Sequence, residues 1–309
     1  MPPRHAAEIR VGPAGWSYND WEGVVYPERK PRNFHEAGYL AQFFDTVEIN
    51  TTFYHPPRPE MVRGWVRRVE GNPRFKFTAK LWQRFTHERA ANLEDEKTFK
   101  RAIEPLAAAG KLGALLMQFP WSFKNTQPNR EFLGGLVVEF MEYPLVAELR
   151  HESWNRPEVF AMLHDLNVGF CNIDQPVIGK SLGPSDRATA PVGYVRLHGR
   201  NYEHWFASSE QSAERYNYLY STAELQPWVE RIRAVAARAD AVYVVTNNHF
   251  RGKAIANGLQ IVNLITQQPV HVPPTLLAHY PELQPIARIE TEPSELRQTD
   301  LFGPVTAGR

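Results

Sequence analysis

Apolar, β-branched runs recur along the chain, and several of them end in polar residues. The clearest run begins at Phe43 and gives way, between Glu48 and Tyr54, to carboxylate, amide, hydroxyl and aromatic side chains. Such a run predicts a buried strand. Alternate residues of a strand share a face, so we expect Glu48 and Asn50 to point the same way. Polar groups at the end of a core strand need partners or a ligand, which makes this strand end a candidate site.

The whole chain repeats this pattern, with about eight predicted strands, most of them followed by a helix. Besides the stretch 43–54, the predicted strands are 9–12, 75–80, 112–119, 145–150, 168–174, 193–199 and 241–249. The predicted helices are 35–44, 60–70, 94–109, 129–141, 156–166, 225–239 and 253–266. The strands are continuously apolar, which indicates a parallel sheet covered on both faces. Units of this kind within about 250 residues favour a TIM (β/α)8-type barrel over an open doubly wound sheet.

The predicted organisation is a single barrel domain over residues 1–268 and a Pro-rich polar tail over 269–309. Neither GxGxxG nor GxxxxGK[ST] occurs after a predicted strand, which argues against a Rossmann or P-loop nucleotide site. No apolar run approaches the length of a membrane span, and the N-terminus lacks a signal-peptide core. With a single cysteine, the sequence favours a cytoplasmic protein without a disulfide framework.

In a closed barrel the reactive side chains lie at the carboxyl ends of the strands and in the loops that follow. We predict four catalytic groups at these positions: Glu48, Glu148, Asp174 and His198. The predicted substrate-binding residues are Trp16, Tyr18, Asn50, Tyr54, Lys80, Gln118, Arg150, Arg196, Arg200, Asn248 and His249. Converging carboxylates, cations and histidines suit general acid–base catalysis, because burial and neighbouring charges separate their pKa values.

Two alternatives stay open at this point. Glu148 with Arg150, or Glu48 with Arg196, could be buried ion pairs that close the barrel end without any catalytic role. The carboxylates and His198 could instead hold a divalent ion. However, the chain has no HxH or HExxH pair, and cations from other strand ends would compete, so we expect no metal and no organic cofactor.

The motifs at the strand ends resemble those of the DUF72, or YecE-like, family, in the same order along the chain. The matching segments are 15–21, 47–54, 75–80, 86–87, 116–120, 148–154, 195–200 and 247–249. Their joint occurrence covers nearly the whole chain up to about residue 264 and is highly specific. The resemblance implies a TIM barrel and does not imply an established reaction.

The tail contains a further motif at 298–302, Gln-Thr-Asp-Leu-Phe. It resembles the short peptide by which bacterial DNA polymerases and repair proteins dock on the sliding clamp. Leu301 and Phe302 would fill an apolar pocket and Gln298 would donate a positioning hydrogen bond. The alternative is that Leu301 and Phe302 pack back onto the barrel.

We therefore predict a hydrolase or lyase that acts on a phosphate-bearing substrate with a ring, and DNA is one candidate source of that substrate. Lys80, Arg150 and Arg196 would hold the phosphate. The formal net charge is +1 at pH 7, which gives no support for a strongly basic nucleic-acid surface. A metabolic enzyme for a free sugar phosphate or nucleotide, and a noncatalytic binding module, remain open alternatives.

Overall fold

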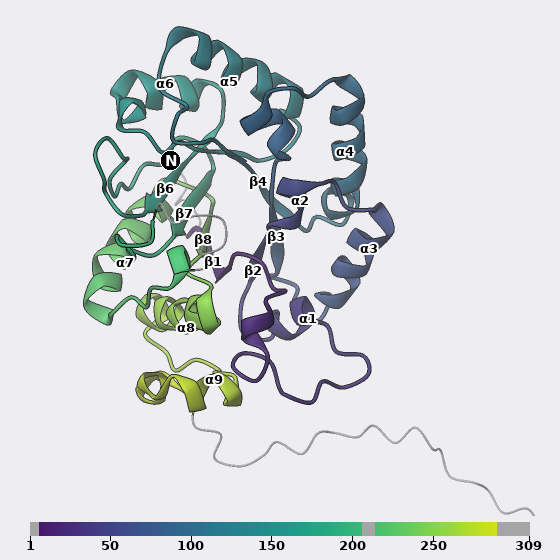
Figure 1. Cartoon of the computed structure of the whole chain (residues 1–309), viewed down its shortest axis with the longest axis vertical. Coiled ribbons are helices and arrows are strands. Elements are labelled where there is room, and N and C mark those ends of the chain that lie inside the picture. The colour runs from purple at the N-terminus through teal and green to yellow at the C-terminus, as the bar shows by residue number, and fades with distance from the viewer. Residues whose placement is uncertain (1–5, 206–213, 289–309) are drawn as a thin grey trace, which may run out of the picture.

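A parallel β-barrel forms the centre of the molecule. The computed structural model describes residues 6–205 and 214–288. Among these residues, eight parallel strands lie in the order β1-β8-β7-β6-β5-β4-β3-β2, with helices on the outside (Figure 1). The strands are β1 (Glu8–Pro13), β2 (Thr46–Ile49), β3 (Lys76–Lys80), β4 (Leu112–Gln118), β5 (Leu145–Glu148), β6 (Gly169–Asp174), β7 (Val192–Leu197) and β8 (Ala241–Thr246). The predicted TIM-type barrel is confirmed.

Helices follow most of the strands and cover the outside of the barrel. They are α1 (Glu36–Leu40), α2 (Thr51–Tyr54), α3 (Pro59–Arg68), α4 (Leu93–Ala108), α5 (Gln127–Phe140), α6 (Pro157–Asp165), α7 (Thr222–Ala236), α8 (Lys253–Thr266) and α9 (Pro274–His279). The connection from β6 to β7, residues 175–191, contains no helix. Local sequence fixes several starts, since Asn92 and Ser221 form capping boxes at α4 and α7.

The first and second strands meet at a narrow seam. β1 pairs with β8 from Glu8 to Pro13, whereas it reaches β2 through a bridge between Ala14 and Glu48. Gly12 permits the close approach, because a Cβ there would lie 1.7 Å from the carbonyl oxygen of Thr46. The barrel is therefore nearly closed, with a weakly paired junction between β1 and β2.

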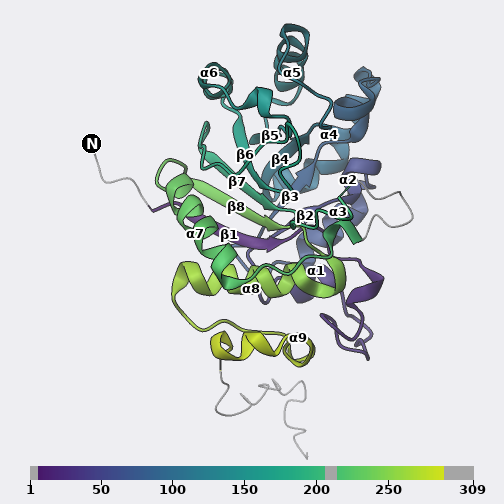
Figure 2. The same cartoon turned by 60° about the vertical axis from the view of Figure 1, so that its left-hand side comes forward.

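The segment after α8 packs back onto the barrel as far as it is described. Leu276 of α9 and Leu283 of the following 3-10 helix (Pro281–Ile286) are fully buried. The hydroxyl of Tyr280 donates to the carbonyl oxygen of Arg251 at 2.6 Å. Figure 2 shows α9 lying beside α8, below the strands. The beginning of the predicted tail is thus an ordered part of the domain that packs on α8 and the barrel. Its buried apolar residues are hard to recognise in the sequence because they stand among prolines.

Strand register brings polar side chains together at one end of the barrel. Gln118 and Glu148 face each other across β4 and β5, and Glu48 lies opposite Thr78 across β2 and β3. Because all strands run in the same direction, their carboxyl ends meet at one rim. This rim carries the candidate site. Among the described residues, no helix has the length and apolar character needed to cross a membrane.

Candidate functional site

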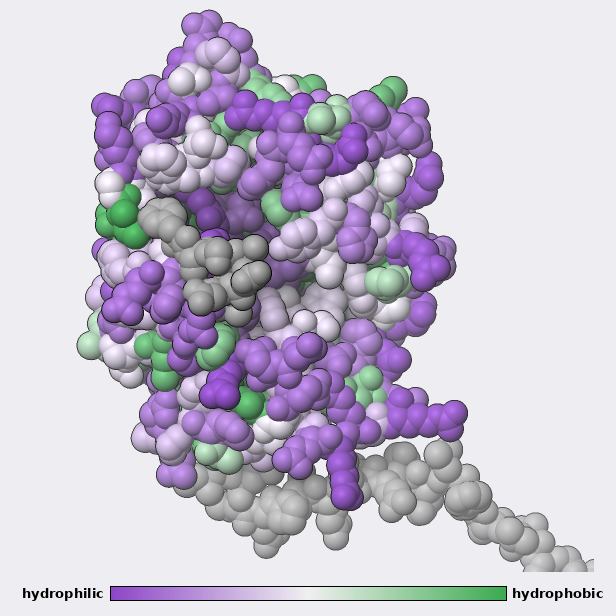
Figure 3. All heavy atoms as spheres, in the orientation of Figure 1, coloured by the Kyte–Doolittle hydropathy of each residue, from purple (hydrophilic) through white to green (hydrophobic). Residues whose placement is uncertain are grey.

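The strand ends and the loops after them enclose a cavity of about 360 Å³. Such a volume is at the lower end of the range for small-molecule sites, about 300–1,000 Å³. Several predicted binding residues line it together: Tyr18, Asn50, Tyr54, Lys80, Gln118, Arg150 and His249. The wall also contains Phe53, His87, Phe119, Pro120, Tyr216 and Asn247. Figure 3 shows a hollow near the middle of one face of the molecule, with hydrophilic residues inside it.

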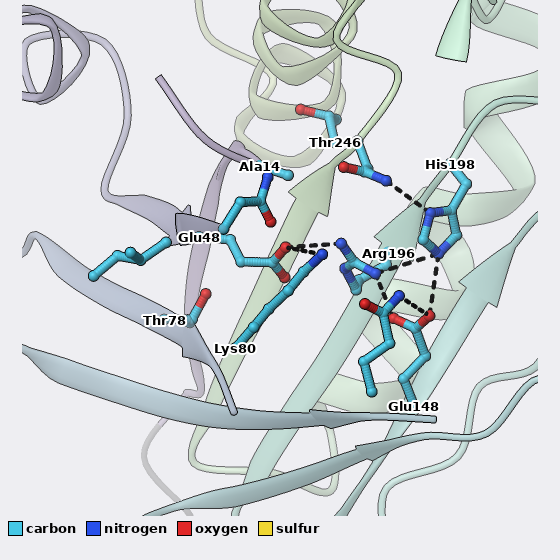
Figure 4. A network of polar contacts seen from close by, with 12 residues as sticks. Ala14, Glu48, Thr78, Lys80, Glu148, Arg196, His198 and Thr246 are labelled. Atoms are coloured by element: carbon cyan, nitrogen blue, oxygen red, sulfur yellow. Dashed lines mark hydrogen bonds and ion pairs between the residues drawn. The ribbon is translucent and has the colours of Figure 1, made fainter. Parts of the chain in front are cut away.

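Arg196 joins two carboxylates from opposite parts of the barrel (Figure 4). Its Nη2 donates to Glu48 Oε1 at 2.7 Å, and its Nη1 donates to Glu148 Oε2. None of the three side chains has any solvent exposure. The structure thus contains the buried Glu48–Arg196 pair that the sequence leaves open as an alternative. These three residues lie behind the cavity wall and do not line it.

The second oxygen of Glu48 is held from the barrel interior. The hydroxyl of Tyr194 donates to Glu48 Oε2 at 2.9 Å and lies 2.8 Å from the hydroxyl of Thr78. Burial and the Glu48 carboxylate raise the pKa of Tyr194 well above its usual value, so the hydroxyl stays protonated. Glu48 is therefore fixed on both oxygens before any ligand arrives.

Glu148 connects the buried network to the cavity wall. Its Oε1 accepts hydrogen bonds from Gln118 Nε2 at 2.9 Å and from Arg150 Nε at 2.7 Å. Burial alone would raise the pKa of Glu148, but Arg196, Arg150 and His198 together hold it well below its usual value. Glu148 is therefore a permanent anion that orients Gln118 and Arg150 toward the cavity.

His198 is a neutral residue within the same network. Asn247 Nδ2 lies 2.9 Å from His198 Nδ1 and can donate to it, which leaves the ring proton on Nε2, 3.6 Å from Glu148 Oε1. Burial, followed by the charge of Arg196, lowers the pKa of His198 to about 3. The imidazole therefore keeps a single proton throughout the physiological range.

Lys80, at the end of β3, is the cation that opens into the cavity. Its Nζ lies 3.9 Å from Glu48 Oε1, beyond hydrogen-bond distance, and its side chain is 12% exposed. Among the described residues this ammonium group has no hydrogen-bond acceptor, although it lies over the ring of Phe53. Burial, followed by the charge of Arg196, lowers the pKa of Lys80 to about 8.

Among the described residues of the cavity wall and the network behind it, the charges do not balance. Glu48 and Glu148 supply two negative charges, and Lys80, Arg150 and Arg196 supply three positive charges. Arg150 is 21% exposed and uses only Nε within this network, so its two terminal nitrogens have no partner among the described residues. The excess positive charge therefore lies at the cavity wall, where an anion can reach it.

Aromatic and imidazole rings form the other side of the cavity. His249 stacks on Tyr18 with ring centroids 4.3 Å apart, and Tyr216 lies 4.7 Å from His249. Burial lowers the pKa of His249 to about 4, and its Nδ1 is buried without a partner among the described residues. These flat faces and the unpaired nitrogen suit a ligand that contains a ring.

His87 is a cavity residue that the strand-end rule misses. It lies in a π-helical turn (Arg84–Glu88) after β3. Its Nδ1 is 3.0 Å from the hydroxyl of Thr86, and its Nε2 has no hydrogen-bond partner in the described part of the chain. Burial, followed by the charge of Arg150, lowers the pKa of His87 to about 4. The Thr86–His87 motif after the third predicted strand was the only signal for it.

Four of the predicted site residues lie outside both the cavity wall and the buried Arg196 network: Asp174, Arg200, Asn248 and Trp16. Asp174 accepts hydrogen bonds from Arg200 and Tyr220 in a separate cluster that does not line the cavity. Asn248 donates to the carbonyl oxygen of Tyr218 and to Asn257, and thereby ties the end of β8 to α8. Trp16, the fourth, packs against Trp65 and Phe77 rather than at the cavity. Their predicted functional roles stay predictions.

In the part of the chain that the structure describes, no three His, Cys, Asp or Glu side chains come together in a way that could hold a metal ion. Glu48, Glu148 and His198 do lie near one another, but Arg196 occupies the space between the two carboxylates. The donor groups are thus already used by a guanidinium, which would repel a divalent cation.

Comparison with known proteins identifies the family of the chain. The family model described as "Protein of unknown function DUF72" matches residues 10–282. The chain belongs to the DUF72 family. The UPF0759 protein YunF of Bacillus subtilis is 28% identical over 276 residues, which are 83% of this chain and 94% of YunF. The Escherichia coli protein YecE is 30% identical over half of each chain.

Solved structures of DUF72 members support the same fold. A DUF72 family protein from Thermotoga maritima has a TM-score of 0.73 and 34% sequence identity, covering 84% of this chain and 99% of that one. A DUF72 family protein from Enterococcus faecalis has a TM-score of 0.74 and 27% identity, covering 84% of this chain and 95% of that one. The predicted family is thereby confirmed.

Proposed function

We propose that this DUF72 protein is a hydrolase or lyase that binds a small phosphate-bearing substrate with a ring in the strand-end cavity. The excess positive charge at the cavity wall is the observation that carries this proposal. Among the described residues, Arg150 presents two unpaired guanidinium nitrogens and Lys80 presents an ammonium without a hydrogen-bond acceptor. A phosphate group would supply the missing negative charge and accept hydrogen bonds from Arg150.

The residues of the wall divide into four roles in this proposal. Arg150 anchors the phosphate, while Gln118 and Asn50 orient the remainder of the substrate. Lys80 exchanges protons, because a pKa of about 8 allows both of its protonation states near neutral pH. The mutually stacked rings of Tyr18 and His249 form an aromatic wall against which the substrate's ring packs.

Glu48, Glu148 and His198 are predicted from the sequence to exchange protons, and this role stays a prediction. None of the three residues lines the cavity. We assign them a positioning role instead. Glu148 orients Gln118 and Arg150 directly, and Glu48 fixes Arg196. Through these contacts the buried network holds the cavity's polar groups in place before the substrate binds.

The size of the cavity supports a single ring-containing phosphate compound as the substrate. About 360 Å³ accommodates one nucleotide or sugar phosphate and does not accommodate a duplex. A free metabolite and one extruded nucleotide of a nucleic acid share this chemistry. The docking motif at 298–302 lies outside the described residues, so the link to DNA rests on a separate prediction.

Binding of phosphate monoesters tests this proposal. Ribose 5-phosphate, AMP and dAMP should raise the melting temperature of the wild-type protein, whereas ribose and adenosine should not. The Arg150→Met variant should lose this stabilisation, and the matched surface variant Arg63→Met, on the exposed face of α3, should keep it. Release of inorganic phosphate or of an unsaturated product is then measured with the ligands that bind. Equal stabilisation of Arg150→Met and wild type would refute the proposed anion site, and binding without turnover would favour a noncatalytic module.

A further inference from the structure

Lys80 differs from a simple anion anchor in its surroundings. A lysine that only holds phosphate works as a permanent cation, usually in contact with water or an acceptor. Lys80 instead lies among Arg150 and Arg196, and its nearest carboxylate oxygen is 3.9 Å away. Its amine is nearly buried but faces the cavity, where Figure 4 shows it beside the Glu48–Arg196 pair. The surroundings of Lys80 therefore disfavour its protonated form, while its nitrogen stays accessible from the cavity.

This arrangement is suited to a nucleophilic amine. Burial and neighbouring cations lower the pKa of Lys80 to about 8. At pH 7 about one tenth of the side chain is then the neutral amine, many times more than for a lysine in water. Because no acceptor among the described residues occupies the nitrogen, its lone pair is free to attack when the proton leaves.

We infer that Lys80 forms an imine with an aldehyde or ketone that also carries a phosphate. This inference rests on the proposed function, because the phosphate has to be bound for the carbonyl group to reach Lys80. Arg150, in the same cavity wall, would hold the phosphate and direct the carbonyl carbon toward Nζ. The proposal assigns the chain to lyase chemistry rather than to phosphate-ester hydrolysis.

The chemical step balances without a further reactant. The lone pair of the neutral Lys80 amine forms a bond to the carbonyl carbon, and the resulting carbinolamine loses its hydroxyl group as water. Both hydrogens of the released water come from the amine nitrogen, by way of proton carriers. Protonation of the imine nitrogen then gives an iminium ion. A C–H bond on the neighbouring carbon can break, with its electron pair passing into an enamine and its proton to a proton carrier.

A proton carrier is present at the same wall. His87 is neutral, since its pKa is about 4, and its Nε2 has no hydrogen-bond partner among the described residues. Both His87 and Lys80 line the cavity. A neutral imidazole can accept the proton that leaves nitrogen and return it to the departing hydroxyl group. The cavity thus supplies an amine, an anion anchor and a proton carrier.

Reductive trapping tests the inference with the purified full-length protein. The probe is pyridoxal 5′-phosphate, which combines a ring, an aldehyde and a phosphate. After brief treatment at low probe concentration and reduction with borohydride, peptide mass spectrometry locates the labelled lysines. We expect Lys80 to be the main labelled residue, and pyridoxal without phosphate to label it at least about tenfold less. Arg150→Met should remove this advantage of the phosphate.

Two variants control this experiment. Lys80→Arg keeps the positive charge but cannot form an imine, so the main adduct should disappear while thermal unfolding stays similar. Lys97→Arg, on the exposed side of α4, should leave labelling of Lys80 unchanged. If phosphate monoesters stabilise the protein but Lys80 is labelled no faster than surface lysines, the imine inference is wrong and the proposed anion site stands. If they do not stabilise it and Lys80 is not preferentially labelled, both proposals fail.

Discussion

The guanidinium of Arg196 lies 2.7 Å from the carboxylate of Glu48, and neither side chain is exposed to solvent. The pair crosses the inside of the barrel mouth, from β7 to β2. Buried ion pairs of this kind gain little over apolar packing, but removal of one partner leaves an uncompensated charge. The network is therefore a rigid floor for the cavity and a point at which the fold is vulnerable.

Replacement of Arg196 tests this vulnerability. Arg196→Met leaves Glu48 and Glu148 buried without their shared cation, and we expect a loss of about 3–5 kcal/mol in the free energy of unfolding. Urea denaturation measures the change. Arg63→Met, which breaks the exposed pair with Glu60, should cost less than about 1 kcal/mol. A similar small loss for Arg196→Met would show that the buried network does not hold the barrel mouth together.

The pH dependence of the free energy of unfolding should show that His198 is neutral in the folded protein. Its pKa is lowered from 6.5 to about 3 in the folded protein, so the unfolded chain binds more protons between these values. The stabilising contribution of His198 is complete above pH 6.5 and is lost as the pH is lowered toward 3, by up to about 1.4 kcal/mol per pH unit. His87 and His249, whose pKa values are about 4, steepen the same part of the profile. His198→Gln should flatten this part of the profile. The exposed His164→Gln serves as the control, and an unchanged slope in His198→Gln would contradict the assignment.

Replacement by alanine should have opposite effects at two glycines, because Gly12 lies at the crowded seam between β1 and β2 and Gly64 lies in the open on α3. Gly12→Ala places a methyl group within 1.7 Å of the Thr46 carbonyl oxygen, so the strands must separate at a cost of about 1–3 kcal/mol or more. Gly64→Ala, inside α3, meets no atom within 4 Å and should stabilise the protein by about 0.5–1 kcal/mol. Melting temperatures of the two variants decide this point. Equal shifts in the same direction would refute the close approach.

The predicted docking motif needs an experiment with the complete chain, because 298–302 lie outside the described residues. The wild-type protein should bind a bacterial sliding clamp with micromolar affinity, and a Leu301→Ala, Phe302→Ala double variant should not. Surface plasmon resonance measures both. Binding lost in the double variant would direct the substrate search to nucleotides within DNA. Absent or unaffected binding would contradict the docking role and favour free metabolites.

Much of the fold could be predicted from sequence, because strand and helix periodicities are local. The helix at Lys253–Thr266 has its predicted limits, whereas the predicted helix over 35–44 is shorter, Glu36–Leu40. His35 caps that helix, and the chain leaves helical geometry before β2. Helix α9 was missed because its prolines hide the apolar residues that pack on the barrel.

The site could be predicted only in part, because the depth of a side chain depends on the closed barrel. The strand-end rule correctly brings Lys80, Gln118 and Arg150 to one cavity. It cannot distinguish them from Glu148, which is close in sequence to Arg150 but lies fully buried behind the wall. His87 is not among the predicted residues, because the sequence does not show that the π-helical turn after β3 brings it back to the cavity.

The seam at Gly12 also has a consequence for the order of folding during synthesis. Strand β1 makes its full register with β8, whereas its β pairing with β2 is limited, among the described residues, to the bridge between Ala14 and Glu48. Strand β1 therefore gains most of its strand pairing from β8. Until Ala241–Thr246 has left the ribosome, Glu8–Pro13 is without its principal partner, and the barrel cannot close. A nascent chain has to keep this strand from other partners until β8 has been made.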